Sequence, residues 1–176
     1  MKKKILVTGG SGFIASHVVD ELIKSGHKLT VLDKKKSNFI NKKCKFIVGD
    51  VKRLKILNKI FKNQEIVFHF AADADLYSSN SKHYNTIQNN ILGTANVLEA
   101  CVNNKVKKII IASSIYSMSS QGGFYSMSKL TSEMLTEKYA EKFKFKFVIL
   151  RFGSIYGKRA NSFNTINNFI NEAKKN

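Results

Sequence analysis

Short apolar runs alternate with longer segments of helical periodicity along the 176 residues of the chain. The runs are rich in β-branched residues and apolar throughout, which is typical of strands that are buried on both faces of a sheet. Strands are expected over residues 4–8, 28–33, 45–50, 65–71, 107–114 and 146–152. Apolar residues at three- and four-residue spacing predict helices over 13–26 (with Gly26 as a stop), 53–63, 84–104, 124–143 and 163–174.

This alternation predicts an α/β fold in which a parallel sheet of about six strands has helices on both faces. Right-handed crossovers then make the sheet doubly wound, and ligands bind at the carboxyl ends of its strands. Residues 34–44 follow neither pattern, so we expect a loop or a poorly formed helix there.

The first expected strand runs directly into a glycine-rich turn, T-G-G-S-G-F-I-A at residues 8–15. Gly9, Gly12 and Ala15 fit the spacing G-x-x-G-x-x-A, and Gly10 also gives G-x-G-x-x-A. Small residues at these positions allow a tight turn, a close approach of backbone to a diphosphate and close packing of the next helix. The free N–H groups at the start of that helix attract phosphate. The turn therefore predicts a dinucleotide site, with a purely structural turn as the alternative.

An acidic residue is expected about 20 residues after such a turn. Asp33 occupies this place, at the end of the second expected strand. A carboxylate here accepts hydrogen bonds from the adenosine ribose and repels a 2′-phosphate, so it favours NAD over NADP. Lys34, Lys35 and Lys36 follow directly and weaken that preference. A solvated turn residue is the alternative role of Asp33.

The stretch FYSMSKLTSE places Tyr125 and Lys129 four residues apart at the start of an expected helix, so they share one helical face. A tyrosine is a poor base near neutral pH, but a neighbouring ammonium group favours its phenolate. Such a pair can take a proton from a substrate hydroxyl while the adjacent carbon gives a hydride to a bound dinucleotide. Two ordinary exposed residues are the alternative.

The formal net charge of +18 raises the question of nucleic-acid binding. Only three of the 30 basic residues are arginines, the residue best suited to bidentate contacts with phosphates and bases. The lysines are scattered, so we expect weak attraction of polyanions at low salt and no specific nucleic-acid partner.

The remaining composition indicates a cytoplasmic protein without a membrane partner. No apolar run approaches the roughly 20 residues that cross a bilayer, and glycines interrupt the N-terminal run MKKKILVTGG early. Two cysteines are too few for a disulfide scaffold, and we expect both thiols to be unpaired. No metal site is expected, because the following residues have no ligand spacing: Cys44, Cys101, His17, His27, His69 and His83.

Eight short motifs occur in one order over nearly the whole chain. They are T-G-G-S-G-F-I (8–14), Asp33, G-D-V (49–51), H-F-A-A (69–72), N-N-I-L-G-T-A-N-V-L-E-A (89–100), A-S-S (112–114), Y-S-M-S-K (125–129) and R-F-G-S-I-Y-G-K-R (151–159). In this order the chain resembles the NAD-dependent epimerase/dehydratase family, the extended short-chain dehydrogenase/reductases that act on nucleotide sugars.

The resemblance implies a Rossmann fold and roles for individual residues. Asp50 and Val51 are expected at the adenine and Asn90 near the cofactor, and Ser114 supplies an active-site hydroxyl. The implied cofactor-binding residues are Gly9, Gly12, Phe13, Ile14, Asp33, Asp50, Val51, Ala71, Ala72, Asn90, Tyr125 and Lys129. The implied catalytic residues are Ser114, Tyr125 and Lys129.

Three features depart from the family pattern. Only ten residues separate Ser114 from Tyr125, so the loop over the substrate is short, and Tyr116 stands near the place of a usual aromatic residue. Ser154 replaces a frequent asparagine, and Lys158 replaces a proline. The chain also stops where a substrate-binding region begins in the family. We therefore expect an N-terminal part, with an NAD-binding domain over 1–160 and the start of a substrate region over 161–176.

These features predict an NAD-dependent enzyme that oxidises a sugar hydroxyl transiently, with Tyr125 as the base. A dehydratase usually has an acid beside the active-site hydroxyl, but Ile115 and Tyr116 follow Ser114. This favours an epimerase, more narrowly a UDP-sugar 4-epimerase. A non-catalytic dinucleotide-binding module is the alternative. The family often dimerises through two helices per subunit, and the segments 84–104 and 124–143 match their positions.

Overall fold

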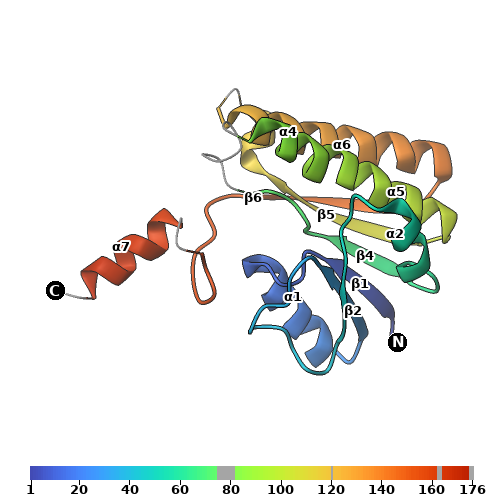
Figure 1. Ribbon diagram of the computed structural model, residues 1–176, viewed down its shortest axis with the longest axis horizontal. Helices are drawn as coiled ribbons and strands as arrows, with labels where there is room; N and C mark the ends of the chain where they lie inside the picture. Colours follow the sequence, from blue (N-terminus) through green and yellow to red (C-terminus); the bar gives the residue numbers. More distant parts are fainter. Residues whose placement is uncertain (75–81, 120, 162–163, 175–176) are drawn as a thin grey trace.

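Six strands form one parallel sheet in the order β3-β2-β1-β4-β5-β6 (Figure 1). The computed structural model describes residues 1–74, 82–119, 121–161 and 164–174. The strands are β1 (Lys4–Thr8), β2 (Lys28–Asp33), β3 (Lys45–Val48), β4 (Ile66–His69), β5 (Lys108–Ser114) and β6 (Lys146–Phe152). The strand order changes direction between β1 and β4, so the sheet is doubly wound, as the sequence predicts.

Helices cover both faces of this sheet (Figure 1). The helices are α1 (Phe13–Lys24), α2 (Leu54–Ile60), α4 (His83–Thr86), α5 (Gly93–Asn103), α6 (Gly123–Phe143) and α7 (Thr165–Ala173). Successive residues of β1 point to opposite faces: Leu6 joins a core under α2, α5 and α6, while Ile5 and Val7 join a core under α1. The doubly wound α/β fold expected from the apolar runs, and the Rossmann fold that the resemblance implies, are confirmed.

The expected helix over 84–104 is interrupted. A π-helical segment, η1 (Ile87–Leu92), lies between α4 and α5. Hydroxyl groups of Thr94 and Ser132 donate to the carbonyl oxygen of Asn90, at 2.5 and 3.2 Å, and so compete for an acceptor of the helix ladder. The segment contains no proline, and its one glycine, Gly93, lies at the C-terminal end of η1, so its periodicity predicted one continuous helix. Segments of this kind occur often at functional sites.

The observed ends of the elements differ most from the expected ends at the loops that follow the carboxyl ends of the strands. β3 and β4 are shorter than the expected 45–50 and 65–71, because Gly49 and Phe70 already belong to those loops. A turn of 3-10 helix, η2 (Ile115–Met118), follows β5 and was not predicted. The structure forms no helix or strand over residues 34–44, in agreement with the loop expected there.

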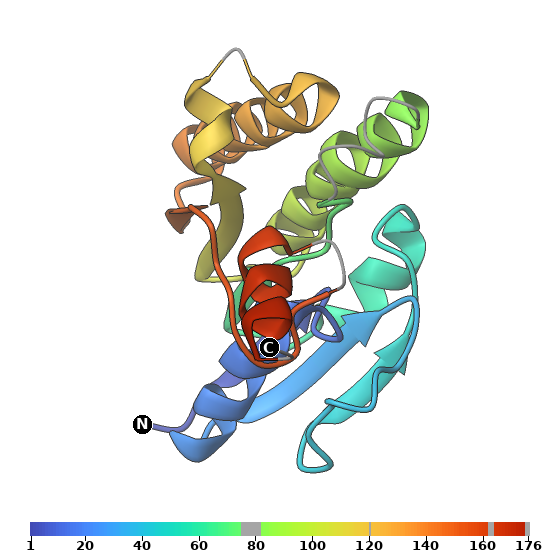
Figure 2. The same cartoon turned by 90° about the vertical axis from the view of Figure 1, so that its left-hand side faces the viewer.

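The C-terminal part stands apart from the main body. α7 has no buried residue, and Phe169 is 65% exposed. In Figure 2 this helix lies in front of the opening between the α1 layer and the α5–α6 layer. Residue 163, the expected first residue of this helix, lies outside the described residues. No helix in the described part of the chain has both the length and the apolar character needed to cross a bilayer.

Gly9 makes the turn out of β1 possible. Its φ of +71° lies in the left-handed region, and an added Cβ would lie 2.5 Å from the backbone nitrogen of Ala71 after β4. The two neighbouring strand ends therefore approach more closely than a side chain allows. Gly26 has a similar φ of +81°, but an added Cβ there would meet nothing within 4 Å.

These two glycines provide a matched pair of variants. We expect Gly26→Ala to cost about 1–2 kcal/mol of unfolding free energy, the usual cost of a left-handed alanine. Gly9→Ala adds a backbone clash, so it should cost clearly more or prevent folding. Urea unfolding of both variants measures the difference. Equal losses would show that the close approach of Gly9 and Ala71 does not constrain the fold.

Candidate active site

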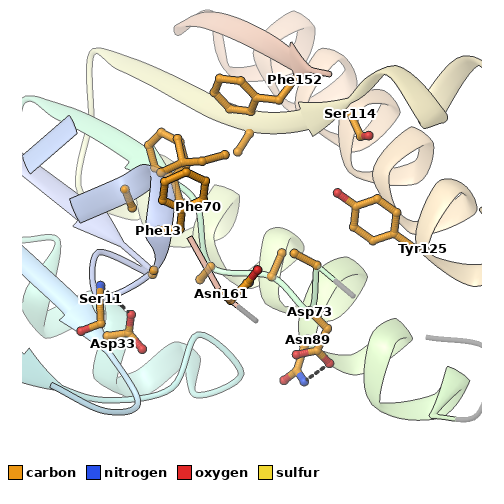
Figure 3. A pocket seen from close by; sticks show the side chains of 18 of the residues that line it. Ser11, Phe13, Asp33, Phe70, Asp73, Asn89, Ser114, Tyr125, Phe152 and Asn161 are labelled. Atoms are coloured by element: carbon orange, nitrogen blue, oxygen red, sulfur yellow. Dashed lines mark hydrogen bonds between the residues drawn. The ribbon is translucent and has the colours of Figure 1, made fainter. Parts of the chain in front are cut away.

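A cleft of about 1190 Å³ opens at the carboxyl ends of the strands (Figure 3). Eleven of the thirteen residues predicted from the sequence line it: Gly9, Gly12, Phe13, Ile14, Asp33, Val51, Ala71, Ala72, Ser114, Tyr125 and Lys129. Asp50 and Asn90, the other two, are not among the residues that line it. Phe13, Phe70 and Phe152 form an apolar wall, and the Phe70 and Phe152 rings stack with their centres 6.2 Å apart.

The glycine turn leaves a cradle at the start of α1. Gly12 is the N-cap residue, and no side chain caps the first turn of the helix. The Gly12 N–H donates to the Gly9 carbonyl at 3.0 Å, and a Cβ on Gly12 would press on that oxygen at 3.2 Å. The uncapped N–H groups and the missing side chain fit a diphosphate placed against the helix end.

Asp33 is held beside this cradle. Its Oδ2 atom accepts a hydrogen bond of 2.9 Å from the backbone N–H of Ser11, so the end of β2 is tied to the glycine turn. The carboxylate faces the cleft (Figure 3). It is therefore already oriented for ribose hydroxyl groups, which is the role predicted for it.

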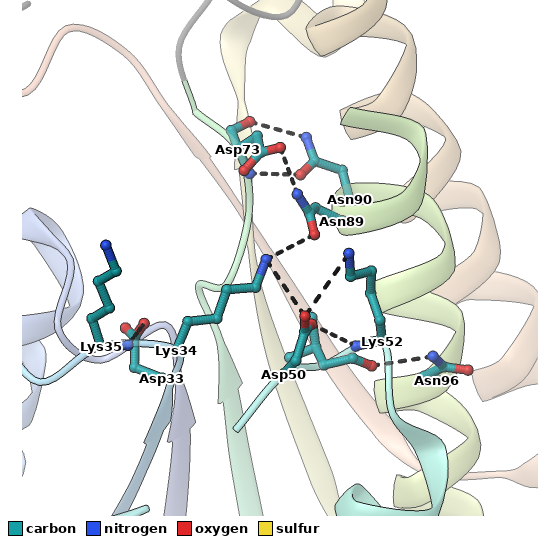
Figure 4. A network of polar contacts seen from close by, with 10 residues as sticks. Asp33, Lys34, Lys35, Asp50, Lys52, Asp73, Asn89, Asn90 and Asn96 are labelled. Atoms are coloured by element: carbon teal, nitrogen blue, oxygen red, sulfur yellow. Dashed lines mark hydrogen bonds and ion pairs between the residues drawn. The ribbon is translucent and has the colours of Figure 1, made fainter. Parts of the chain in front are cut away.

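The side chain of Lys34 turns away from Asp33 and reaches the opposite wall (Figure 4). Its Nζ donates to Asn89 Oδ1 at 3.0 Å and lies 3.7 Å from Asp50 Oδ2. Asn89 in turn donates to Asp73 Oδ2 at 2.7 Å. Lys34 is therefore engaged with carboxylate and amide groups on the wall opposite Asp33. Asp50 serves this network and does not line the cleft.

Asn90 is buried and ties the segment after β4 to two helices. Its side-chain amide accepts from the Asp73 N–H at 2.7 Å and donates to the Asp73 carbonyl at 3.0 Å and to Ser128 Oγ at 2.9 Å. Figure 4 shows this double contact with the Asp73 backbone. Asn90 thus shapes the cleft wall from behind.

Tyr125 and Lys129 lie on the buried face of α6, and Tyr125 points its hydroxyl into the cleft near Ser114 (Figure 3). Burial raises the pKa of Tyr125, and the hydrogen bond with Ser114 offsets only part of this effect. Lys129 Nζ lies 5.7 Å from the centre of the Tyr125 ring and donates to the Ala112 carbonyl at 2.9 Å. Burial lowers the pKa of Lys129 to about 8, while Glu133 acts in the opposite direction.

The lysine was expected to favour the phenolate of Tyr125. In the structure burial prevails, and the tyrosine is a weaker acid than usual. The pair is brought together as predicted, but a further positive charge beside Tyr125 is needed to lower its pKa.

His69, to which no chemistry was assigned, is a buried structural residue. Its Nδ1 atom lies 2.7 Å from Thr8 Oγ1, and its Nε2 atom lies 3.0 Å from Thr94 Oγ1. Burial lowers the pKa of His69 to about 3, and the nearby Lys129 contributes in the same direction. The imidazole is therefore neutral near pH 7 and joins β1, β4 and α5 beneath the cleft.

Two groups near the site were not predicted from the sequence. Glu133 is buried on α6, one turn beyond Lys129, and binds Arg151. Arg159 pairs with Asp20 at 2.8 Å and thereby fastens the segment after β6 to α1. Repeated four-residue spacing after Tyr125 and Lys129 would have pointed to Glu133. No local pattern indicates the contact of Arg159, which joins residues 139 positions apart.

Of the positions that depart from the family pattern, Tyr116 and Ser154 line the cleft and Lys158 does not; three polar residues of the C-terminal segment line it as well. Tyr116, Ser154, Asn161, Asn164 and Thr165 all contribute to its lining. An aromatic ring and several polar groups therefore surround the side on which a substrate would lie, although the loop between Ser114 and Tyr125 is short.

The model of the NAD dependent epimerase/dehydratase family matches residues 5–176. The dTDP-D-glucose 4,6-dehydratase of Dictyostelium discoideum is 34% identical over 206 residues, covering 96% of this chain and 48% of that protein. The UDP-N-acetyl-alpha-D-glucosaminuronate decarboxylase of Bacillus cytotoxicus is 31% identical over 188 residues, covering 91% of this chain and 57% of that protein. The chain thus spans about half the length of these relatives.

A solved structure is similar to this chain as well. The UDP-glucose 4-epimerase of Thermus thermophilus, in complex with NAD, superposes with a TM-score of 0.86 at 29% identity. The match covers 93% of this chain and 59% of that one. Proteins named for three different reactions are therefore similar to this chain, each over about half of its own length.

Proposed function

The chain belongs to the NAD-dependent epimerase/dehydratase family, and we propose that it forms the cofactor half of a nucleotide-sugar epimerase/dehydratase. Residues 1–160 form the NAD-binding domain in this proposal, and residues 161–176 begin the region that selects the sugar. The observation that carries the proposal is the shared cleft, in which the glycine cradle, Asp33 and the Tyr125–Lys129 pair line one cavity.

The lining residues fit a dinucleotide laid along the strand ends. In the proposed arrangement the diphosphate lies at Gly12 and the first turn of α1, and the adenosine ribose at Asp33. Ala71 and Ala72 keep the middle of the cleft free of bulky side chains. Tyr125 and Lys129 lie at the far end, where the nicotinamide and its ribose would be held.

When bound in the cleft, NAD would supply the acceptor for a hydride from a sugar carbon. Tyr125 takes the proton from the hydroxyl on that carbon, and Ser114 donates a hydrogen bond to the same oxygen. Lys129 and the positive charge of an oxidised nicotinamide would together stabilise the phenolate, and Lys129 would also bind a ribose hydroxyl. Tyr125 would return the proton to the sugar oxygen in the reverse step.

The surroundings of Ser114 favour epimerisation over dehydration. Among the described residues, the carboxylates that line the cleft are those of Asp33 and Asp73. Asp33 is held by Ser11 and Asp73 by Asn89, and both lie away from Ser114 (Figure 3). No described acid is therefore placed to protonate a leaving hydroxyl beside Ser114, and we propose a UDP-sugar 4-epimerase.

Tyr125→Phe in the natural protein at its full length tests the mechanism. Loss of the general base should lower kcat by about 10²–10⁴-fold, with the Kd for NAD nearly unchanged. UDP-glucose and dTDP-glucose are suitable substrates for the assay. Tyr139→Phe is the matched control on α6, because that hydroxyl binds Glu99.

Unchanged turnover in Tyr125→Phe would remove this residue from the mechanism. If the unmodified protein bound NAD and turned over neither nucleotide sugar, the non-catalytic module would be the better description.

Asp33→Asn tests the cofactor preference. Removing the charge should weaken NAD binding and reduce the repulsion of a 2′-phosphate, so the ratio of NAD to NADP affinity should fall by about 10-fold or more. Asp73→Asn is the control, since it removes a carboxylate from the same cleft. Calorimetric titration with both cofactors measures the ratio. An equal fall in both variants would contradict the specific role of Asp33.

We also propose that the protein is a homodimer through α6 and the α4–η1–α5 segment. These helices lie side by side (Figure 1), and α6 exposes Met127, Leu130 and Met134. Tyr84 and Leu92 on the neighbouring segment are exposed as well. A second copy that brings the same two helices would cover this surface.

Leu130→Glu in the full-length protein should convert the dimer to monomers in sedimentation experiments, because it places charge in an apolar interface. Phe169→Glu on α7, another exposed apolar residue, should leave the dimer intact. An unmodified protein that sediments as a monomer at micromolar concentration would overturn this proposal.

A further inference from the structure

Glu133 is a buried carboxylate that the proposed chemistry does not use. Its residue is only 3% exposed, and it follows Tyr125 and Lys129 at four-residue intervals on the same face of α6. The three residues form a row that begins in the cleft and ends behind it.

Four donor groups converge on this carboxylate. Ser113 and Ser117 both donate their hydroxyls to Oε1, the latter at 2.8 Å. Arg151 donates from Nε to both oxygens, at 3.1 and 3.2 Å, and from Nη2 to Oε2 at 2.6 Å. The pair is bidentate, a geometry that fixes direction as well as distance.

The donors come from three different elements around Ser114. Ser113 precedes it on β5, Ser117 lies in the η2 turn that follows it, and Arg151 lies on β6. Ser113 and Arg151 are direct partners in the parallel pairing of β5 with β6. The carboxylate of α6 therefore fixes both sides of Ser114 relative to the helix that carries Tyr125.

The same carboxylate provides the negative charge nearest to Lys129 on this helix face. Burial disfavours the charged form of Glu133, but the hydrogen bonds from Arg151, Ser113 and Ser117 outweigh it, and its pKa lies below the usual value. Glu133 is thus ionised at neutral pH, and it opposes the effect of burial on the pKa of Lys129.

The other groups around Lys129 carry no opposing charge near neutral pH. Tyr125 precedes it on α6 and has a raised pKa, His69 on β4 is neutral, and β5 contributes the carbonyl of Ala112. Tyr116 on η2 lies near Tyr125 and further raises its pKa. Charge at Lys129 therefore depends on Glu133 and, through it, on Arg151 of β6.

We propose that Glu133 is a positioning residue, which clamps Ser114 opposite Tyr125 and, balanced by Arg151, places a negative charge one helical turn from Lys129. The inference rests on the proposed function, because it assigns the clamp to the same site. A buried ion pair alone says little about stability, since desolvation offsets much of its attraction. The distinguishing feature is electrostatic: Glu133 acts directly on Lys129, whereas Arg151 acts on it only by balancing the charge of Glu133.

Two single variants separate positioning from a merely structural role. Glu133→Gln removes a negative charge near Lys129, so the ammonium form should be lost at lower pH. Arg151→Gln leaves Glu133 without its cation, so the ammonium form should persist to higher pH. The pH at which NAD affinity falls should therefore move in opposite directions, each by about half a unit or more. The basic limb of kcat should move in parallel.

The measurement is a calorimetric titration with NAD between pH 6 and 10, together with the pH profile of kcat in the full-length protein. Glu141→Gln is the control, because this exposed carboxylate on α6 pairs with Lys138. In the double variant Glu133→Gln/Arg151→Gln both charges are removed, so the net charge of the pair is unchanged. The pH at which NAD affinity and kcat fall should therefore return towards that of the unmodified protein.

Each outcome bears on the inference separately from the proposed function. Opposite shifts in NAD affinity support it even if no nucleotide sugar is turned over. The inference is overturned if the pH at which NAD affinity falls moves in the same direction in both variants, or if both variants fold and this pH does not move. Either result overturns it even if Tyr125→Phe abolishes turnover. If Glu133→Gln does not fold, the upward shift in Arg151→Gln decides alone.

Discussion

The cleft depends on the parallel pairing of β1, β4 and β5, which brings the carboxyl ends of three strands to one edge. The register places Thr8 beside His69 and His69 beside Ile111. The residues that follow each strand must then share one small volume. Gly9 approaches Ala71 at a distance that excludes a side chain, and Lys129 reaches the carbonyl of Ala112. The glycine turn and the Tyr125–Lys129 pair line one cleft because β1 and β4 end level with each other, while β5 continues beyond Ile111 to Ser114.

Helix α6 shows a second constraint that follows from this arrangement. Its buried face is largely polar and carries Tyr125, Ser128, Lys129, Ser132, Glu133 and Thr136. Its apolar residues Met127, Leu130 and Met134 face outward. Buried polar groups are tolerated when they are hydrogen-bonded, and here Asn90, Thr94, the Ala112 carbonyl and Arg151 provide partners. The helix gives up apolar burial within the subunit in order to carry the site, and it presents an apolar surface outside.

Much of the fold could be predicted from the sequence because strands buried on both faces are apolar throughout. The glycine spacing at Gly9 and Gly12 and the acid at Asp33 located the cradle, and the four-residue spacing of Tyr125 and Lys129 located the pair. The π-helical segment at Asn90 could not be predicted, since it is accompanied by contacts with hydroxyls of two helices that only the folded chain brings together. The arrangement of α6, with polar residues buried and apolar residues exposed, likewise depends on the elements that pack against it. Glu133 was within reach of the spacing argument, whereas Arg159 and Asp20 meet only in the folded chain.

The central claim is that one cleft holds the dinucleotide, with its adenosine at Asp33 and its nicotinamide at Tyr125. A crystal structure of the chain grown with NAD tests this directly. The account predicts the diphosphate at the N-terminus of α1, the ribose on the Asp33 carboxylate and the nicotinamide ring beside Tyr125, Ser114 and Lys129. NAD bound elsewhere, or bound with the nicotinamide away from Tyr125, would contradict it.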